Sequence, residues 1–137
     1  MNSQNTILIV DDEQLLVETI SFNLERAGFL VLKAFDGESG LAQALESKPQ
    51  LMILDVMLPH LSGWDVCRTL RAASPYGKVL PILMLTARGE ARDREKSFAA
   101  GASDYMLKPF SMQDLIDRIQ TLLNGVEAPQ SDVKSTP

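Results

Sequence analysis

Short runs of apolar residues alternate along this chain with segments whose apolar residues recur every three to four positions. The runs are ILIV (7–10), FLVL (29–32), LMIL (51–54), ILML (82–85) and YML (105–107). Because each run is apolar throughout, it is typical of a strand that is buried on both faces of a sheet. The first intervening segment, 14–27, has helical spacing, and Gly28 follows it as a left-handed cap would.

Four more helices are predicted, over 39–46, from just after Ser62 and Gly63 to about 73, over about 91–100, and from Ser111 to 123. Ser111 and Asp114 have the spacing of a capping-box pair at the start of the last helix. A strand followed by a helix, five times over, predicts an α/β fold with a parallel sheet and helices on both faces. Right-handed crossovers then place every strand-to-helix loop at one edge of the sheet.

Four of the five apolar runs end in a chemically useful polar residue. These residues are Asp11 and Asp12 after the first run, Asp55 after the third, Thr86 after the fourth, and Lys108, followed by Pro109, after the last. The run 29–32 ends without such a group and fits an edge strand. In open α/β sheets, ligands bind at the carboxyl ends of the strands. The sequence therefore predicts a crevice that suits a divalent cation and a phosphoryl group.

The three aspartates favour a metal site. Carboxylates held within several ångströms of one another repel strongly, and octahedral Mg²⁺ neutralises them with a few oxygen ligands. For an isolated pair, the simpler interpretation is that Asp11 caps a helix and Asp12 is a solvated loop residue. Here Asp55 ends a second buried strand, and this third carboxylate favours the metal interpretation.

The other strand-end residues favour phosphoryl chemistry. A carboxylate such as Asp55 can attack phosphorus and form an acyl phosphate. Lys108 and Thr86 are suited to bind two phosphoryl oxygens, and the small side chain of Ala87 leaves room for the group. Alternatively, Thr86 is an ordinary strand residue and Lys108 a surface charge. A cis peptide bond before Pro109 is one way to aim the lysine inward.

Bulk properties limit the classes of function. The chain has 137 residues, 45% of them hydrophobic, which suits one domain, and its net charge of −5 argues against general nucleic-acid binding. No apolar stretch approaches the roughly 20 residues that cross a bilayer, and the N-terminus does not resemble a signal peptide. The single cysteine, Cys67, fits a cytoplasmic location. We expect a domain over 5–123 and a linker or disordered tail over 124–137.

Four segments together resemble the receiver domain of two-component response regulators. They are ILIVDDE (7–13), LMILDVMLPHLSGWD (51–65), PILMLTA (81–87) and GASDYMLKPF (101–110). The resemblance implies a doubly wound, flavodoxin-like (βα)5 fold with strand order 2-1-3-4-5. It also implies the following roles: Asp55 as phosphoacceptor, Asp11 and Asp12 with the Met57 carbonyl as Mg²⁺ ligands, Thr86 as switch hydroxyl, Lys108 as phosphate-binding lysine, Tyr105 as switch aromatic, and Pro109 after a cis bond.

This resemblance also implies a function. A histidine kinase or a phosphotransfer protein donates the phosphoryl group, with Mg²⁺ (or Mn²⁺ in its place) as cofactor. The domain catalyses only its own phosphorylation and slower dephosphorylation, and it is not a conventional enzyme. The phosphorylated state repacks the face formed by the fourth helix, the fifth strand and the fifth helix. That face then controls dimerisation, an output domain or a partner, without direct contact between this chain and nucleic acid or membrane.

The same face carries a pattern similar to the dimer face of the OmpR/PhoB subfamily. It comprises Arg94, Phe98, Asp104, Asp114 and Arg118. In a twofold dimer, Arg94 would pair with Asp114 and Asp104 with Arg118 across the interface, while Phe98 supplies apolar contact. The alternative is an ordinary charged surface, because exposed ion pairs each contribute at most about 1 kcal/mol. The sequence leaves open whether the domain acts alone or with an output domain.

Three other functions are weaker candidates. A hydrolase of the haloacid dehalogenase type also uses a strand-end aspartate, but it needs a second acid two positions later, where this chain has Met57. A degenerate receiver that only binds would lack a site residue, and none is missing. A dinucleotide-binding fold would have a glycine-rich G-x-G-x-x-G after the first strand, and this chain has none.

Overall fold

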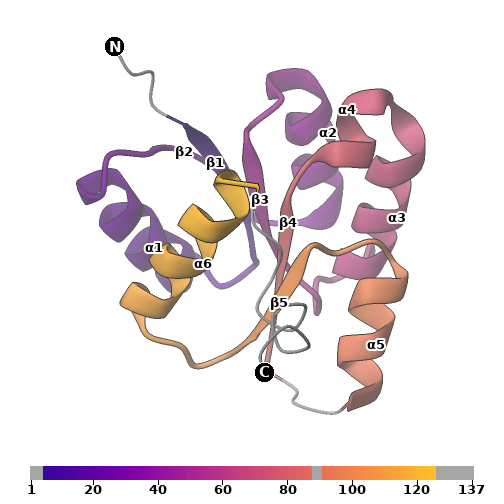
Figure 1. Ribbon diagram of the computed structural model, residues 1–137. Coiled ribbons are helices and arrows are strands. Elements are labelled where there is room, and N and C mark those ends of the chain that lie inside the picture. Colours follow the sequence, from indigo (N-terminus) through magenta and orange to yellow (C-terminus); the bar gives the residue numbers. More distant parts are fainter. Residues whose placement is uncertain (1–4, 88–90, 126–137) are drawn as a thin grey trace, which may run out of the picture.

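The computed structural model describes residues 5–87 and 91–125, and its centre is a parallel five-stranded sheet (Figure 1). The strands are β1 (Thr6–Val10), β2 (Leu30–Ala34), β3 (Leu51–Asp55), β4 (Ile82–Thr86) and β5 (Asp104–Leu107). Their order across the sheet is β2-β1-β3-β4-β5. The predicted doubly wound α/β fold and strand order are therefore confirmed.

Helices cover both faces of the sheet (Figure 1). They are α1 (Gln14–Arg26), α2 (Gly37–Ser47), α3 (Gly63–Ala73), α4 (Pro75–Val79), α5 (Ala91–Ala99) and α6 (Met112–Leu123). The helices α1 and α6 pack on one face, and α2, α3 and α5 lie on the other. Each face has its own hydrophobic core, because successive side chains of a strand point to opposite sides. In β1, Ile7 and Ile9 join one core while Leu8 and Val10 join the other.

The central strands are the most deeply buried part of the chain. Every residue of β3 and β4 is buried, whereas four of the five residues of the edge strand β2 are partly or fully exposed. The apolar runs of β3 and β4 therefore correspond to strands covered on both faces, as expected, whereas the apolar run of β2 lies at the edge of the sheet. Their carboxyl ends inherit this burial, so polar residues placed there are withdrawn from water.

Local signals at the helix ends agree with the sequence. The Ser62 side chain accepts a hydrogen bond from the Asp65 N–H at the start of α3, and Ser111 does the same with the Asp114 N–H at the start of α6. Gly28, after α1, has a φ of 99°, which is left-handed. These caps satisfy backbone groups that the helices themselves leave without partners.

Two elements differ from expectation. The short helix α4 was not predicted, because five residues are too few to show a helical period. Ser74 caps it, Pro75 begins it, and a side chain at Gly77 would collide with the Leu70 carbonyl. The strand β2 begins one residue later than expected, since Phe29 turns into the core instead of pairing.

The expected tail over 124–137 falls outside the described residues from 126 onwards, so that prediction stays open. In the part of the chain that the structure describes, no helix is both long enough and apolar enough to cross a bilayer.

We predict that Lys48→Gly stabilises the fold. Lys48 is the exposed C-cap of α2 and adopts a left-handed conformation with φ 49° and ψ 60°. A non-glycine residue pays a steric cost of roughly 1 kcal/mol in this conformation. Urea unfolding should therefore show a gain of about 0.5–1 kcal/mol for Lys48→Gly over Lys48→Ala, the matched control. Equal stability of the two variants would contradict the prediction.

Candidate functional site

Three carboxylates meet where β1 and β3 end. Asp11 and Asp12 directly follow β1, and Asp55 is the last residue of β3. The two strands are neighbours and pair Val10 with Leu54, so the next rung brings Asp11 beside Asp55. One oxygen from each of the three aspartates lies within 4.8 Å of the others. Asp11 and Asp55 are buried, whereas Asp12 is exposed.

Hydrogen bonds fix two of these carboxylates. Asp11 accepts the backbone N–H of Glu13 at 2.9 Å on one oxygen and the Lys108 ammonium at 2.9 Å on the other. Asp55 accepts the Met57 N–H at 3.2 Å, and its oxygen lies 3.6 Å from the Lys108 nitrogen. Lys108 therefore sits between the two buried carboxylates, and its own side chain is only 16% exposed.

The electrostatics of the site show an excess of negative charge. Burial and, next, repulsion by Asp11 raise the pKa of Asp55 from its ordinary 3.8 to about 6, although Lys108 and the Met57 N–H act to lower it. Burial acts to lower the pKa of Lys108, but the hydrogen bond to Asp11 and the charge of Asp55 outweigh it and raise that pKa. One ammonium does not neutralise three carboxylates, and such an all-oxygen set fits Mg²⁺.

The end of β4 brings a hydroxyl to the same edge. Asp55 pairs with Leu85 in the sheet, so Thr86 lies one residue further along the neighbouring strand. Thr86 is fully buried, and its carbonyl accepts the backbone N–H of Lys108 at 2.7 Å. Ala87 follows it and is exposed. The peptide bond between Lys108 and Pro109 is cis.

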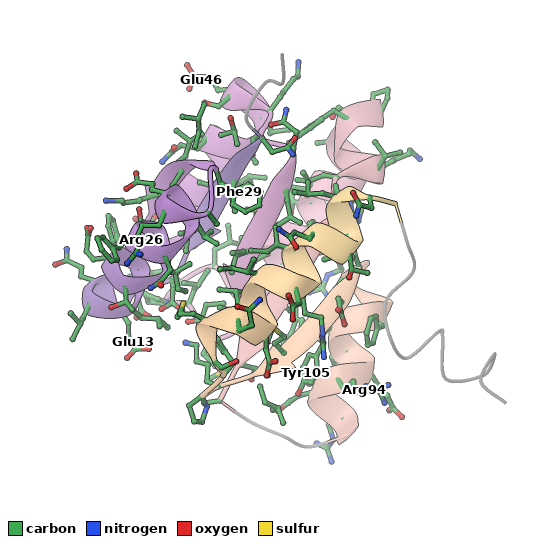
Figure 2. All side chains as sticks on the ribbon, turned by 60° about the vertical axis from the view of Figure 1, so that its left-hand side comes forward. Glu13, Arg26, Phe29, Glu46, Arg94 and Tyr105 are labelled. Carbon is green, nitrogen blue, oxygen red and sulfur yellow. The ribbon has the colours of Figure 1, made fainter. Side chains whose placement is uncertain are left out.

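A hollow of about 370 Å³ opens beside Lys108, between the start of α1 and the segment after β5. Its lining includes Glu13, Leu16, Ala87, Phe110 and Met112. Figure 2 shows Glu13 at the start of α1, and its carboxylate lies 3.4 Å from the Lys108 nitrogen. Sequence reasoning gave Glu13 no role, although its place next to the acidic pair was a signal.

The expected dimer-face residues lie on α5, β5 and α6. Asp104 and Arg118 pair within one chain, with the Arg118 guanidinium donating to the Asp104 carboxylate at 2.9 Å. The expected pairing of these two residues across a twofold interface stays a prediction. The Asp104 side chain is only 3% exposed, and burial raises its pKa in spite of the Tyr105 N–H and Arg118.

Two other residues of that face, Arg94 and Asp114, help to line a groove of about 420 Å³ between α5 and α6. Tyr105 and the exposed Arg94 and Asp114 line it, and Figure 2 labels Arg94 on α5 and Tyr105 on β5. The Arg94 guanidinium lies 5.8 Å from the centre of the Phe98 ring. Burial raises the pKa of the Tyr105 hydroxyl, with a smaller contribution from Asp93.

Comparison with known proteins agrees with this geometry. The family model described as "Response regulator receiver domain" matches residues 7–120. The alkaline phosphatase synthesis transcriptional regulatory protein PhoP of Bacillus subtilis is 45% identical over 131 residues, which cover 94% of this chain and 53% of PhoP. The chain thus spans about half the length of the curated relatives it matches.

Solved structures give the same result. A putative response regulator from Chloroflexus aurantiacus superposes with a TM-score of 0.84 at 40% identity, over 89% of this chain and 99% of that one. The receiver domain of the sensor histidine kinase PA1611 from Pseudomonas aeruginosa was solved with a magnesium ion coordinated in its active-site cleft. It superposes with a TM-score of 0.82 at 30% identity, over 89% of this chain and 99% of that one. This chain therefore belongs to the response regulator receiver domain family and is a phosphorylation-dependent switch domain of two-component signalling.

Proposed function

We propose that Asp55 is the phosphoacceptor of this switch. The observation that carries the proposal is the placement of one partly buried ammonium, Lys108, 3.6 Å from the Asp55 carboxylate within a cluster of three aspartates. Asp55 is 6% exposed at its side chain, so an attacking oxygen has little water to compete with. Its pKa of about 6 leaves it ionised, and therefore nucleophilic, at neutral pH.

The acidic cluster would hold Mg²⁺ through Asp11, Asp12 and Asp55, with the Met57 carbonyl as a further ligand. Among the described residues it is the only group of three or more acidic, histidine or cysteine side chains that could hold a metal ion. When bound, the ion neutralises the carboxylates and a phosphoryl oxygen. The magnesium ion in the receiver domain of PA1611 supports this assignment. Mn²⁺, which also prefers oxygen ligands, is proposed as a substitute.

The chemical step transfers a phosphoryl group from a phosphohistidine of a sensor kinase or phosphotransfer protein. A carboxylate oxygen of Asp55 forms the new O–P bond as the N–P bond of the donor breaks, and the donor imidazole keeps that electron pair. The Lys108 ammonium balances charge on one phosphoryl oxygen, and the Thr86 hydroxyl donates to another. Met57 has no proton to donate to a leaving group, so hydrolysis of the acyl phosphate is slow.

The switch is read out on the face of α5, β5 and α6, where Tyr105, Arg94 and Asp114 surround the groove. We propose that this face forms a homodimer or contacts an output domain or partner, and that 5–123 is the receiver unit with 124–137 as linker. PhoP is a transcriptional regulator about twice as long as the match, which supports control of an output function. A cytoplasmic location stays a prediction from the free, buried Cys67.

Incubation with acetyl phosphate and Mg²⁺ should add one phosphoryl group to the chain. Intact-mass spectrometry should detect the adduct in the unaltered protein and in Asp117→Asn, a control that removes an exposed carboxylate of α6. Asp55→Asn should show none, because the nucleophile is gone, and Lys108→Ala should lower the yield at least tenfold. An adduct on Asp55→Asn, or no adduct at saturating Mg²⁺, would refute the proposal.

The charge of Asp55 should make the metal-free protein less stable as pH rises. A pKa raised to about 6 means that the folded chain holds the proton more tightly than the unfolded chain. The contribution of protonated Asp55 to the free energy of unfolding is therefore complete below about pH 4 and is lost as pH rises through 6. At neutral pH this loss amounts to about 3 kcal/mol. Asp55→Asn should not show this loss.

Urea unfolding in a chelator, from about pH 4 to pH 8, tests this expectation. The difference in unfolding free energy between Asp55→Asn and the unaltered chain should grow across that range. The control Asp117→Asn keeps Asp55, so its stability should fall with pH as that of the unaltered chain does. Mg²⁺ should restore much of the stability of the unaltered chain at neutral pH. A difference that stays constant with pH would contradict the assigned pKa.

Beryllofluoride, a phosphoryl mimic, should convert the chain to a dimer in size-exclusion chromatography with light scattering. Arg94→Glu and Asp114→Lys should each weaken the dimer, because each places like charges opposite one another, and the double variant should recover it. Arg92→Glu, also exposed on α5, is the matched control and should dimerise normally. A monomer at every concentration tested would exclude this interface.

A further inference from the structure

The helix α3 begins directly on the backbone of the proposed phosphoacceptor. The Gly63 N–H donates to the Val56 carbonyl at 3.0 Å. A β-carbon on Gly63 would lie only 2.2 Å from the Asp55 carbonyl oxygen, so no larger residue allows this close approach. The first turn of α3 is therefore packed directly against the backbone at the end of β3.

The next residue, Trp64, reaches from α3 to α5, which lies on the same face of the sheet (Figure 1). Its indole N–H donates to the Ser97 hydroxyl at 3.0 Å, and that hydroxyl donates to the Asp93 carbonyl at 3.0 Å. Ser97 is fully buried, and the Lys96 ammonium lies 5.0 Å from the centre of the Trp64 ring. A buried hydroxyl that both accepts and donates has little freedom to shift without losing a partner.

The last turn of α3 holds the end of α5 as well. The Arg71 guanidinium donates to the Gly101 carbonyl through two nitrogens, at 2.9 Å and 2.7 Å. It also donates to the Gly77 and Leu80 carbonyls, which ties the same side chain to α4 and to the chain entering β4. Because Arg71 makes four of these bonds from one planar group, the turn after α5 has a fixed position relative to α3.

One attachment falls in the C-terminal half of α5 and the other just after its end. Trp64 contacts Ser97, Arg71 contacts Gly101, and the Ala102 N–H donates to the Ser97 carbonyl, which closes the end of the helix. The first half of α5 follows the connection from Thr86 and carries Arg94, which lines the groove with Tyr105. The helix therefore has an end held by α3 and an end joined to the proposed phosphoryl site.

We propose that Trp64 is a positioning residue whose hydrogen bond to Ser97 makes residues 97–102 the fixed end of α5 and of the turn after it, so that phosphorylation moves residues 91–96. This inference rests on the proposed function at Asp55. It adds a second route from Asp55 to the readout face, through Gly63 and Trp64, that holds part of α5 still while Thr86 and Tyr105 move the rest.

Hydrogen exchange with and without beryllofluoride and Mg²⁺ tests the inference. In the unaltered chain, beryllofluoride should change exchange in peptides covering 91–96 and leave 97–102 unchanged. In Trp64→Phe, which keeps a ring but loses the donor, exchange at 97–102 should rise about fivefold, and the beryllofluoride-induced change should spread into that segment. Ser97→Ala should behave in the same way, and the double variant should add nothing.

Cys67→Ala is the matched control, since Cys67 is buried in α3 and its loss weakens packing without touching this bond. It should leave the beryllofluoride-induced change confined to 91–96. A change in the unaltered chain that covers α5 uniformly, or a Trp64→Phe pattern equal to that of Cys67→Ala, would overturn the inference. Intact mass after acetyl phosphate treatment separates this failure from failure at Asp55, because a phosphorylated Trp64→Phe chain with an unaltered exchange pattern refutes only the tether.

Discussion

The repulsion among three carboxylates, held together by a hydrophobic sheet, is the constraint on which the rest of this domain depends. Asp11 and Asp55 are buried because they lie at the carboxyl ends of the central strand β3 and its neighbour β1, and the cores on both faces fix those strands. Three carboxylates and the single ammonium of Lys108 leave two negative charges. A divalent cation would neutralise these two negative charges. Without a cation, the repulsion between the carboxylates destabilises the folded state.

The Lys108 ammonium has two competing carboxylate partners, and a change of charge on one of them would shift its position. Its ammonium lies 2.9 Å from Asp11 and 3.6 Å from Asp55, so the stronger contact is with the carboxylate that would not be phosphorylated. A phosphoryl group on Asp55 adds charge on the other side of the ammonium. The backbone N–H of Lys108 also donates to the Thr86 carbonyl. A shift of Lys108 would therefore displace the ends of both β4 and β5.

The sequence predicted the sheet and the polar residues at its carboxyl edge well, since buried strands and the residues that follow them leave strong local patterns. The positions of Asp11, Asp55, Thr86 and Lys108 at one sheet edge follow from apolar runs and crossover handedness alone. The short helix α4 has no period to detect. The pairing of Asp104 with Arg118 within the chain was not predicted for another reason: a charge pattern does not say which partner is nearer in a single chain.

Side-chain bonds between helices are equally invisible in a sequence, yet they decide how a charge at the sheet edge reaches the surface. A helix released at both ends would spread a small displacement over many soft contacts. The first turn of α3 lies against the backbone of Asp55, and Arg71 in its last turn donates to the Gly101 carbonyl. The helix α3 therefore links the phosphoryl site that we propose to the far end of α5. If residues 97–102 are the fixed end that we propose, motion at the near end of α5 becomes a tilt about that point and reorients Arg94 relative to α6.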